Sequence, residues 1–153
     1  MVTFRRGSRL GVDVGSVRVG VARCDPDGIL AVPVTTLTRD DAVFGAIAKL
    51  ASEFEVIEVL VGHPVKLNGA IGPAAEAAAA FAGQLTMELE VPVRLVDERM
   101  TTTSAQRSLH AAGRDTRGSR SVIDQQAAAL IVQTAIDAEK TTGRPPGAIV
   151  EVT

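Results

Sequence analysis

With 153 residues, 46% of them hydrophobic, and a formal net charge of −2, the chain has the size and composition of one domain with a single core. It has neither the ~20 consecutive apolar residues of a membrane span nor the apolar core of a signal peptide, so we expect a cytoplasmic protein with no membrane partner. The single cysteine, Cys24, excludes an intramolecular disulfide and an all-cysteine zinc site.

The N-terminal part of the chain predicts three antiparallel strands. Residues 9–15 and 17–24 are apolar, β-branched or glycine almost throughout, which is typical of buried strands. The turn sequence Asp-Pro-Asp-Gly at residues 25–28 precedes a third apolar run at residues 29–36. We therefore expect an antiparallel meander.

Helices and strands alternate in the rest of the chain. Apolar residues recur at helical spacing in residues 41–55 and 122–139, which predicts helices there. An alanine-rich run after a proline predicts a helix at residues 74–89, and a threonine cap with a closing glycine predicts one at residues 102–110. Two β-branched runs, residues 56–62 and 93–96, predict strands that follow helices and therefore run parallel to the first strand. Residues 140–153 predict a flexible C-terminal tail, in which residues 149–150 are able to dock.

This order of elements, β-β-β-α-β-α-β-α-α, predicts an α/β fold. Three antiparallel strands followed by two parallel ones form a mixed five-stranded sheet with helices on both faces, which is the RNase H-like arrangement. We assign residues 1–139 to this single domain and residues 140–153 to the tail.

Asp13 is the only carboxylate in the apolar run that starts the meander. Burial of an ion without a partner costs roughly several kcal/mol, so Asp13 must bind a metal, accept hydrogen bonds from turn amides or be protonated. Capping of the tight turn at Gly15 is the purely structural alternative. The functional interpretation is that Asp13 anchors a metal site.

Two further carboxylates are candidates for the same site. Glu98 follows a strand parallel to that of Asp13 and would point into the crevice at the same sheet edge, and Asp124 lies one turn into the last helix. Their mutual repulsion is tolerable chiefly beside a divalent cation, and oxygen-only ligands suit Mg²⁺ or Mn²⁺. Two such ions about 4 Å apart would activate water and stabilise the leaving oxygen of a phosphodiester displacement.

Structural alternatives exist for these residues. Asp124 follows Ser121 by three positions, which is the spacing of a capping box. Asp97 and Glu98 are adjacent and would point to opposite faces of a strand, so only one can be a direct ligand. We favour Glu98 as the ligand and Asp97 as hydrogen-bonding support.

Charge is unevenly distributed along the chain. Residues 1–23 carry a net charge of +4 and residues 94–120 carry +3, whereas residues 40–90 carry −6. The two basic segments predict a basic rim around the site, although a solvated surface of mixed charge explains the counts equally well. Without Trp or Tyr, the protein would read a nucleic acid through its backbone or shape. The arginines expected to contact substrate are Arg18, Arg99, Arg114, Arg117 and Arg120.

Four motifs in order resemble the YqgF/RuvX family, described as pre-16S rRNA nucleases and as Holliday-junction-resolvase-like proteins. They are residues 10–22, 61–69, 96–109 and 123–128, and the resemblance covers residues 8–139. It implies an RNase H-like fold and metal-dependent phosphodiester cleavage, with catalytic acids at Asp13, Glu98 and Asp124. It also implies processing of the 5′ end of 16S rRNA, with cleavage of four-way DNA junctions as the competing assignment.

The chain departs from the family pattern at two positions. His63 stands where the family usually has Leu, and Cys24 where it often has Ser. The first leaves open how the loop after His63 binds substrate. His63 and His110 are more typical of surface or packed histidines than of general bases, and Cys24 of a small hydrophobic strand residue.

Two other classes of function fit parts of the sequence. Residues 13–16 followed by a strand also resemble the first phosphate loop of actin/hsp70-type ATP-binding proteins, but 153 residues leave no room for their second domain. A nucleic-acid-binding or ribosome-assembly protein could keep the fold without catalysis.

For a nuclease of this family, the substrate is expected to be structured RNA or a four-way DNA junction. A resolvase is expected to be a homodimer, whereas trimming of an RNA end works with a monomer.

Overall fold

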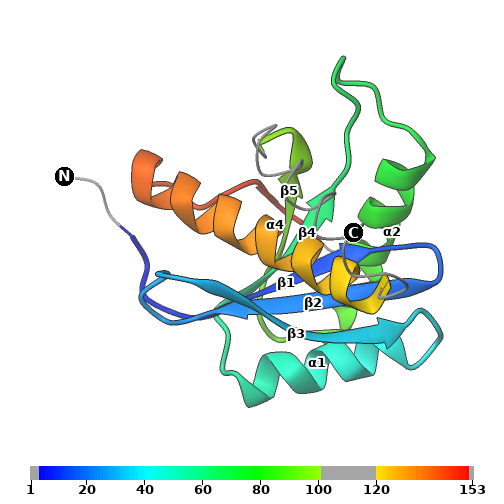
Figure 1. Cartoon of the computed structure of the whole chain (residues 1–153), viewed down its shortest axis with the longest axis horizontal. Helices are drawn as coiled ribbons and strands as arrows, with labels where there is room; N and C mark the ends of the chain where they lie inside the picture. The colour runs from blue at the N-terminus through cyan, green and yellow to red at the C-terminus, as the bar shows by residue number, and fades with distance from the viewer. Residues whose placement is uncertain (1–3, 101–119, 152–153) are drawn as a thin grey trace.

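A six-stranded mixed sheet covered by helices forms the protein (Figure 1). The computed structural model describes residues 4–100 and 120–151. The strands are β1 (Arg9–Val14), β2 (Arg18–Cys24), β3 (Ala31–Thr38), β4 (Glu58–His63), β5 (Val93–Asp97) and β6 (Ala148–Ile149). The helices are α1 (Val43–Glu53), α2 (Pro73–Glu88), the 3₁₀ turn η1 (Glu98–Met100) and α4 (Arg120–Thr142).

The strand order is β3-β2-β1-β4-β5-β6, with β1 near the centre. β1 pairs antiparallel with β2 and parallel with β4, β2 pairs antiparallel with β3, and β4 pairs parallel with β5. The predicted sequence of three antiparallel and then two parallel strands is therefore confirmed. Because β1, β4 and β5 are parallel, their carboxyl ends meet at one edge of the sheet.

The C-terminal residues differ from the predicted flexible tail, and the sheet has six strands rather than five. α4 continues to Thr142, and β6 then pairs antiparallel with β5, with Ala148 opposite Leu95. The backbone N–H of Val150 also donates to the carbonyl of Val93 at 2.8 Å. Residues 149–150 therefore dock, as the sequence allowed, but a strand of two residues is too short to show a period and was not predicted as a strand.

The third strand begins at Ala31, later than the apolar run predicts. The carboxylate of Asp25 accepts hydrogen bonds from the backbone N–H groups of Ile29 and Leu30, at 2.8 and 2.9 Å. These two residues therefore belong to the turn after β2, and their side chains are exposed.

Alternating residues of the central strands build two cores. Leu10 and Val12 of β1 pack with Ile47 of α1 and Phe81 of α2 on one face. On the other face Cys24 packs with residues of β4, β5 and α4, and Figure 1 shows α4 crossing that face. No helix within the two described ranges is both long enough and apolar enough to cross a membrane.

Glycines on the α4 side of the sheet let this helix approach closely. A Cβ atom on Gly11 would collide with Val132 of α4, and one on Gly20 would collide with the backbone carbonyl of Asp124. The chain therefore places the N-terminal turns of α4 almost on the backbone of β2. This close packing brings Asp124 to the sheet edge where β1 ends.

Candidate active site

Asp13 lies near the carboxyl end of β1, on the face covered by α4. Its cross-strand partner on β2 is Gly20. The parallel pairing with β4 ends at Val12 and Val61, so the residue that follows on β4, beside Asp13, is Gly62. Burial raises the pKa of Asp13 to about 6, and the negative charge of Asp124 contributes to the shift. The central carboxylate is therefore flanked by two residues without side chains, which leaves room for groups from α4 and β5.

Glu98 follows β5 directly and opens the short turn η1. Its carboxylate lies over Gly62, where a Cβ atom would be 2.5 Å from Oε1 of Glu98. Burial raises the pKa of Glu98 to about 7, and the charges of Asp13 and Asp97 add to the shift. Asp13 and Glu98 thus form a pair of neighbouring, half-buried carboxyl groups at the carboxyl edge.

Asp124 comes to the same edge from the first turns of α4. Its Oδ2 accepts a hydrogen bond from Nε of Arg18 at 2.9 Å. α4 begins at Arg120, so Ser121 lies inside the helix and does not cap it from the preceding position. The capping interpretation of Asp124 therefore gives way to a contact with the sheet.

The three carboxylates influence one another electrostatically in pairs, and Asp13 belongs to both pairs. The charge of Asp124 acts on Asp13, and the charge of Asp13 acts on Glu98. No group of three His, Cys, Asp or Glu side chains within residues 4–100 and 120–151 is close enough to hold a metal ion in the present side-chain positions. The described side-chain positions therefore do not bring all three carboxylates together on one cation, and their convergence stays a prediction.

The donor set nevertheless suits a hard divalent cation. No described Arg or Lys forms an ion pair with Asp13 or Glu98, although burial and mutual repulsion act on both carboxylates. Carboxylate oxygens are the ligands that Mg²⁺ and Mn²⁺ prefer, and such a cation would offset the repulsion. Rotation of the Asp124 side chain away from Arg18 would supply a third ligand.

Asp97 is occupied by a different partner. Its carboxylate binds Nε and Nη2 of Arg99 at 3.0 and 2.6 Å, and it also accepts the Arg99 backbone N–H at 2.8 Å. The Arg99 guanidinium holds the pKa of Asp97 below its usual value. In register Asp97 lies opposite His63 of β4. Among the described contacts, then, Asp97 positions Arg99 rather than hydrogen-bonding Glu98.

The arginines expected to bind substrate divide into two groups. Arg18 and Arg99 lie at the carboxyl edge, each paired with one acidic residue. Arg114 and Arg117 lie outside the described residues, and Arg120 is the first residue of α4, whose side chain is not described. The helix predicted at residues 102–110 also lies outside the described residues.

Sequence reasoning missed the glycines under the site and the partner of Asp124. Gly20 and Gly62 have no reactive side chain, so the sequence did not predict that they lie beneath Asp124 and Glu98. A signal was present on β2, where Gly20 and Ala22 alternate with valines, but β4 has no such alternation before Gly62. The pairing of Arg18 with Asp124 joins residues 106 positions apart and leaves no local signal.

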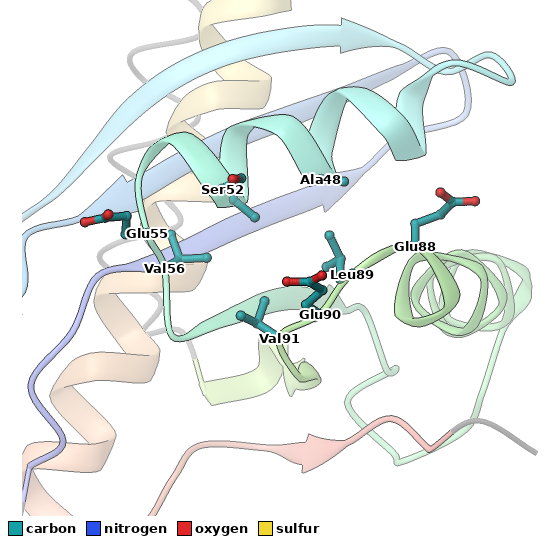
Figure 2. A pocket seen from close by; sticks show the side chains of 9 residues that line it. Ala48, Ser52, Glu55, Val56, Glu88, Leu89, Glu90 and Val91 are labelled. Atoms are coloured by element: carbon teal, nitrogen blue, oxygen red, sulfur yellow. The ribbon is translucent and has the colours of Figure 1, made fainter.

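A pocket of about 390 Å³ lies away from these residues. Figure 2 shows Ala48 and Ser52 of α1 on one side of it and Leu89, Glu90 and Val91, which connect α2 to β5, on the other. None of the candidate catalytic residues lines this pocket, so it is not the site built by the carboxylates.

The sequence matches proteins of one family along most of its length. The family model of RuvX, described as Holliday junction resolvase, matches residues 7–138. A relative from Streptomyces coelicolor is 52% identical over 152 residues, which cover 97% of this chain and 91% of that protein. One from Thermobifida fusca is 51% identical over an alignment of 158 residues, which covers 98% of this chain and 99% of that protein. Both are named as candidate pre-16S rRNA nucleases.

The fold is similar to solved structures of RuvC from Thermus thermophilus. RuvC in complex with Holliday junction substrate has a TM-score of 0.61 at 12% identity, covering 92% of this chain and 99% of that one. A second RuvC structure has a TM-score of 0.60 at 13% identity, with coverages of 90% and 99%. This likeness confirms the predicted RNase H-like fold. The match over residues 7–138 shows that the chain belongs to the RuvX family.

Proposed function

We propose that this protein is a divalent-metal-dependent nuclease that hydrolyses phosphodiester bonds during 5′-end processing of pre-16S rRNA. The observation that carries the proposal is the pair of half-buried carboxyl groups of Asp13 and Glu98, whose pKa values are raised to about 6 and about 7. Groups with such shifts concentrate at functional sites. The names of relatives that are about half identical to the chain support the choice of RNA substrate.

In this proposal Asp13, Glu98 and Asp124 hold Mg²⁺ or Mn²⁺. Such cations, when bound, polarise the phosphate ester and lower the pKa of the attacking water. Asp13 sits on the central strand and is the most firmly placed ligand, and Glu98 reaches the site over Gly62. Both carboxyl groups must lose a proton before they act as ligands, so cation binding releases protons near neutral pH.

The proposed substrate contacts come from the basic residues around this edge. Arg18 and Arg99 supply positive charge beside the carboxylates, and Arg114, Arg117 and Arg120 follow in the connection to α4. Guanidinium groups bind phosphate oxygens through paired N–H donors, which positions the backbone of a nucleic acid without reading its sequence.

The test is cleavage of a structured RNA that contains the 5′ precursor end of 16S rRNA, with Mg²⁺ or Mn²⁺ present. Asp13→Asn is expected to abolish cleavage while circular dichroism shows a folded protein. Asp41→Asn is the matched control, because it makes the same change at an exposed residue before α1. Cleavage by Asp13→Asn at the wild-type rate would refute the site. Binding of the RNA without cleavage in any metal would favour a non-catalytic assembly role.

Cleavage of a Holliday junction is the second candidate function, and the similarity to RuvC supports it. A four-way junction has two-fold symmetry, so its cleavage calls for a dimer, whereas trimming an RNA end does not. One preparation tested on both substrates, with its mass measured in solution, separates the two. A dimer that cuts the four-way junction and leaves the RNA intact would overturn the rRNA assignment.

A further inference from the structure

Two of the proposed roles conflict at a single ion pair. Arg18 begins β2 and is a proposed phosphate ligand, whereas Asp124 is a proposed cation ligand. In the structure the Arg18 guanidinium donates to the Asp124 carboxylate at 2.9 Å, and their side chains are 32% and 21% exposed. While this contact persists, the Arg18 guanidinium cannot bind a phosphate and the Asp124 carboxylate cannot bind a cation.

The backbone around Asp124 is fixed, so the conflict must be resolved by side-chain rotation. The Asp124 carbonyl packs on Gly20, which is the cross-strand partner of Asp13. The start of α4 is also tied to β3, because the Thr36 hydroxyl donates to the Ser121 carbonyl at 2.7 Å and accepts from Gln125 at 3.1 Å. Translation of the helix would break these contacts, whereas rotation of one side chain would not.

The direction of that rotation follows from the charges nearby. Asp124 already acts electrostatically on Asp13, so a cation bound by Asp13 would attract the Asp124 carboxylate away from Arg18. A partly exposed ion pair is a weak interaction, and a divalent ion offers a stronger one. The released guanidinium would then lie beside the cation, where a phosphate group of the substrate has to sit.

We propose that Arg18 is a positioning residue that holds Asp124 away from the cation site until a divalent ion binds, and is then released to bind the substrate phosphate. This inference rests on the proposed function. It also explains why no group of three potential ligands is assembled within the described part of the chain. Since the cation removes the competitor of the phosphate, binding of cation and nucleic acid is positively coupled, and linkage requires the coupling to be reciprocal.

The first test measures Mn²⁺ binding to the full chain by calorimetry, with no nucleic acid present. Arg18→Gln is expected to bind Mn²⁺ about two- to fivefold more tightly than wild type, the fold-change that corresponds to loss of a partly exposed ion pair. Arg99→Gln is the matched control, because it removes the same charge from an arginine of the same edge that pairs with Asp97 instead. An equal effect in both variants would overturn the inference, since it would reflect through-space charge alone.

A double-mutant cycle isolates the contact itself. In an Asp124→Asn background, Arg18→Gln is expected to leave Mn²⁺ affinity unchanged, because the amide has no charge and the ion pair is already absent. The second readout is binding of an uncut RNA in Ca²⁺ and in EDTA. Ca²⁺ should increase the affinity of the wild type more than that of Arg18→Gln.

The outcomes separate this inference from the proposed function. If Asp13→Asn and wild type bind Mn²⁺ equally, the proposed metal site fails. If binding depends on Asp13 but Arg18→Gln binds Mn²⁺ as wild type does or more weakly, only the inference about Arg18 fails. Weaker binding would mean that Arg18 orients Asp124 towards the cation.

Discussion

The two ends of the sheet bury carboxylates in opposite ways. At the amino ends of β1 and β4, Glu139 binds Nη2 of Arg5 at 2.7 Å and Nη2 of Arg9 at 3.0 Å. Glu58 binds Nη1 of Arg5 at 2.7 Å and Nε of Arg94 at 3.3 Å. At the carboxyl ends, Asp13 and Glu98 face other carboxylates instead.

The pKa values follow from this difference. Burial opposes ionisation of Glu139, but the hydrogen bonds from Arg5 and the charge of Arg9 outweigh it, so the pKa of Glu139 lies below its usual value. Asp13 and Glu98 have burial and repulsion acting in the same direction, and their pKa values rise. A buried carboxylate with a guanidinium partner holds the fold together, whereas one beside another carboxylate calls for a cation.

The largest expected effect is at the carboxyl end. Glu98→Gln should lower the rate of cleavage by about a thousandfold or more, because a bound cation contributes several kcal/mol of transition-state stabilisation that would be lost. Single-turnover cleavage of the precursor RNA measures this loss. If Glu98→Gln retained most of its activity at saturating Mg²⁺, the carboxylates at the carboxyl ends of the strands would not form the cation site.

The next effect is at the amino end and concerns stability. Glu139→Ala leaves the guanidinium of Arg9 buried without this partner and should lower the free energy of unfolding by about 3–5 kcal/mol. Urea denaturation followed by circular dichroism measures it. Catalysis by the fraction that stays folded should be close to wild type, and a loss of less than about 1 kcal/mol would contradict the structural role.

In the absence of metal, Asp13→Asn is expected to raise the free energy of unfolding, whereas Glu139→Ala lowers it. The pKa of Asp13 is raised from 3.8 to about 6, so the folded protein bears the cost of the ionised group above pH 6 and none below pH 4. Asp13→Asn should therefore be more stable than wild type by about 1–3 kcal/mol at pH 8, and the gain should vanish as the pH falls towards 4.

Denaturation in EDTA between pH 4 and pH 8 tests whether Asp13→Asn is more stable than wild type. The charge that raises the pKa of Asp13, besides burial, is that of Asp124, which is itself bound to Arg18. The charge of Asp13 acts in turn on Glu98. Added Mg²⁺ should raise the melting temperature of the wild type but not of the variant. A variant less stable than wild type at pH 8 in EDTA would show that the Asp13 carboxylate supports the fold.

The smallest effect concerns the rim. Arg99→Gln should remove one phosphate contact and lower the salt dependence of RNA binding by about 0.7–0.9 in the slope of log K against log salt. Affinity measured between 50 and 200 mM salt would show it. A slope equal to wild type would mean that Arg99 only pairs with Asp97.

Much of the fold could be predicted from local patterns. The alternation of apolar residues in β1 and β2 and the helical spacing in α1 and α2 depend on neighbours a few positions apart, so they appear in any short window. For β6 the sequence indicated only that residues 149–150 are able to dock, because these residues are ordered by pairing with β5 rather than by a pattern of their own. The sequence motifs indicate the candidate catalytic acids but not their partners.

The sequence by itself determined that Asp13 is a carboxylate in a segment that must be buried, and its motifs indicated the family. Only the tertiary structure decided that Arg18 holds Asp124 and that Arg5 and Arg9 hold Glu139, across separations of 106, 134 and 130 positions. The reason is physical. A run of apolar neighbours in the chain predicts that a segment is buried, whereas the partner of a buried charge depends on which distant segments the packing of α4 on the sheet brings together.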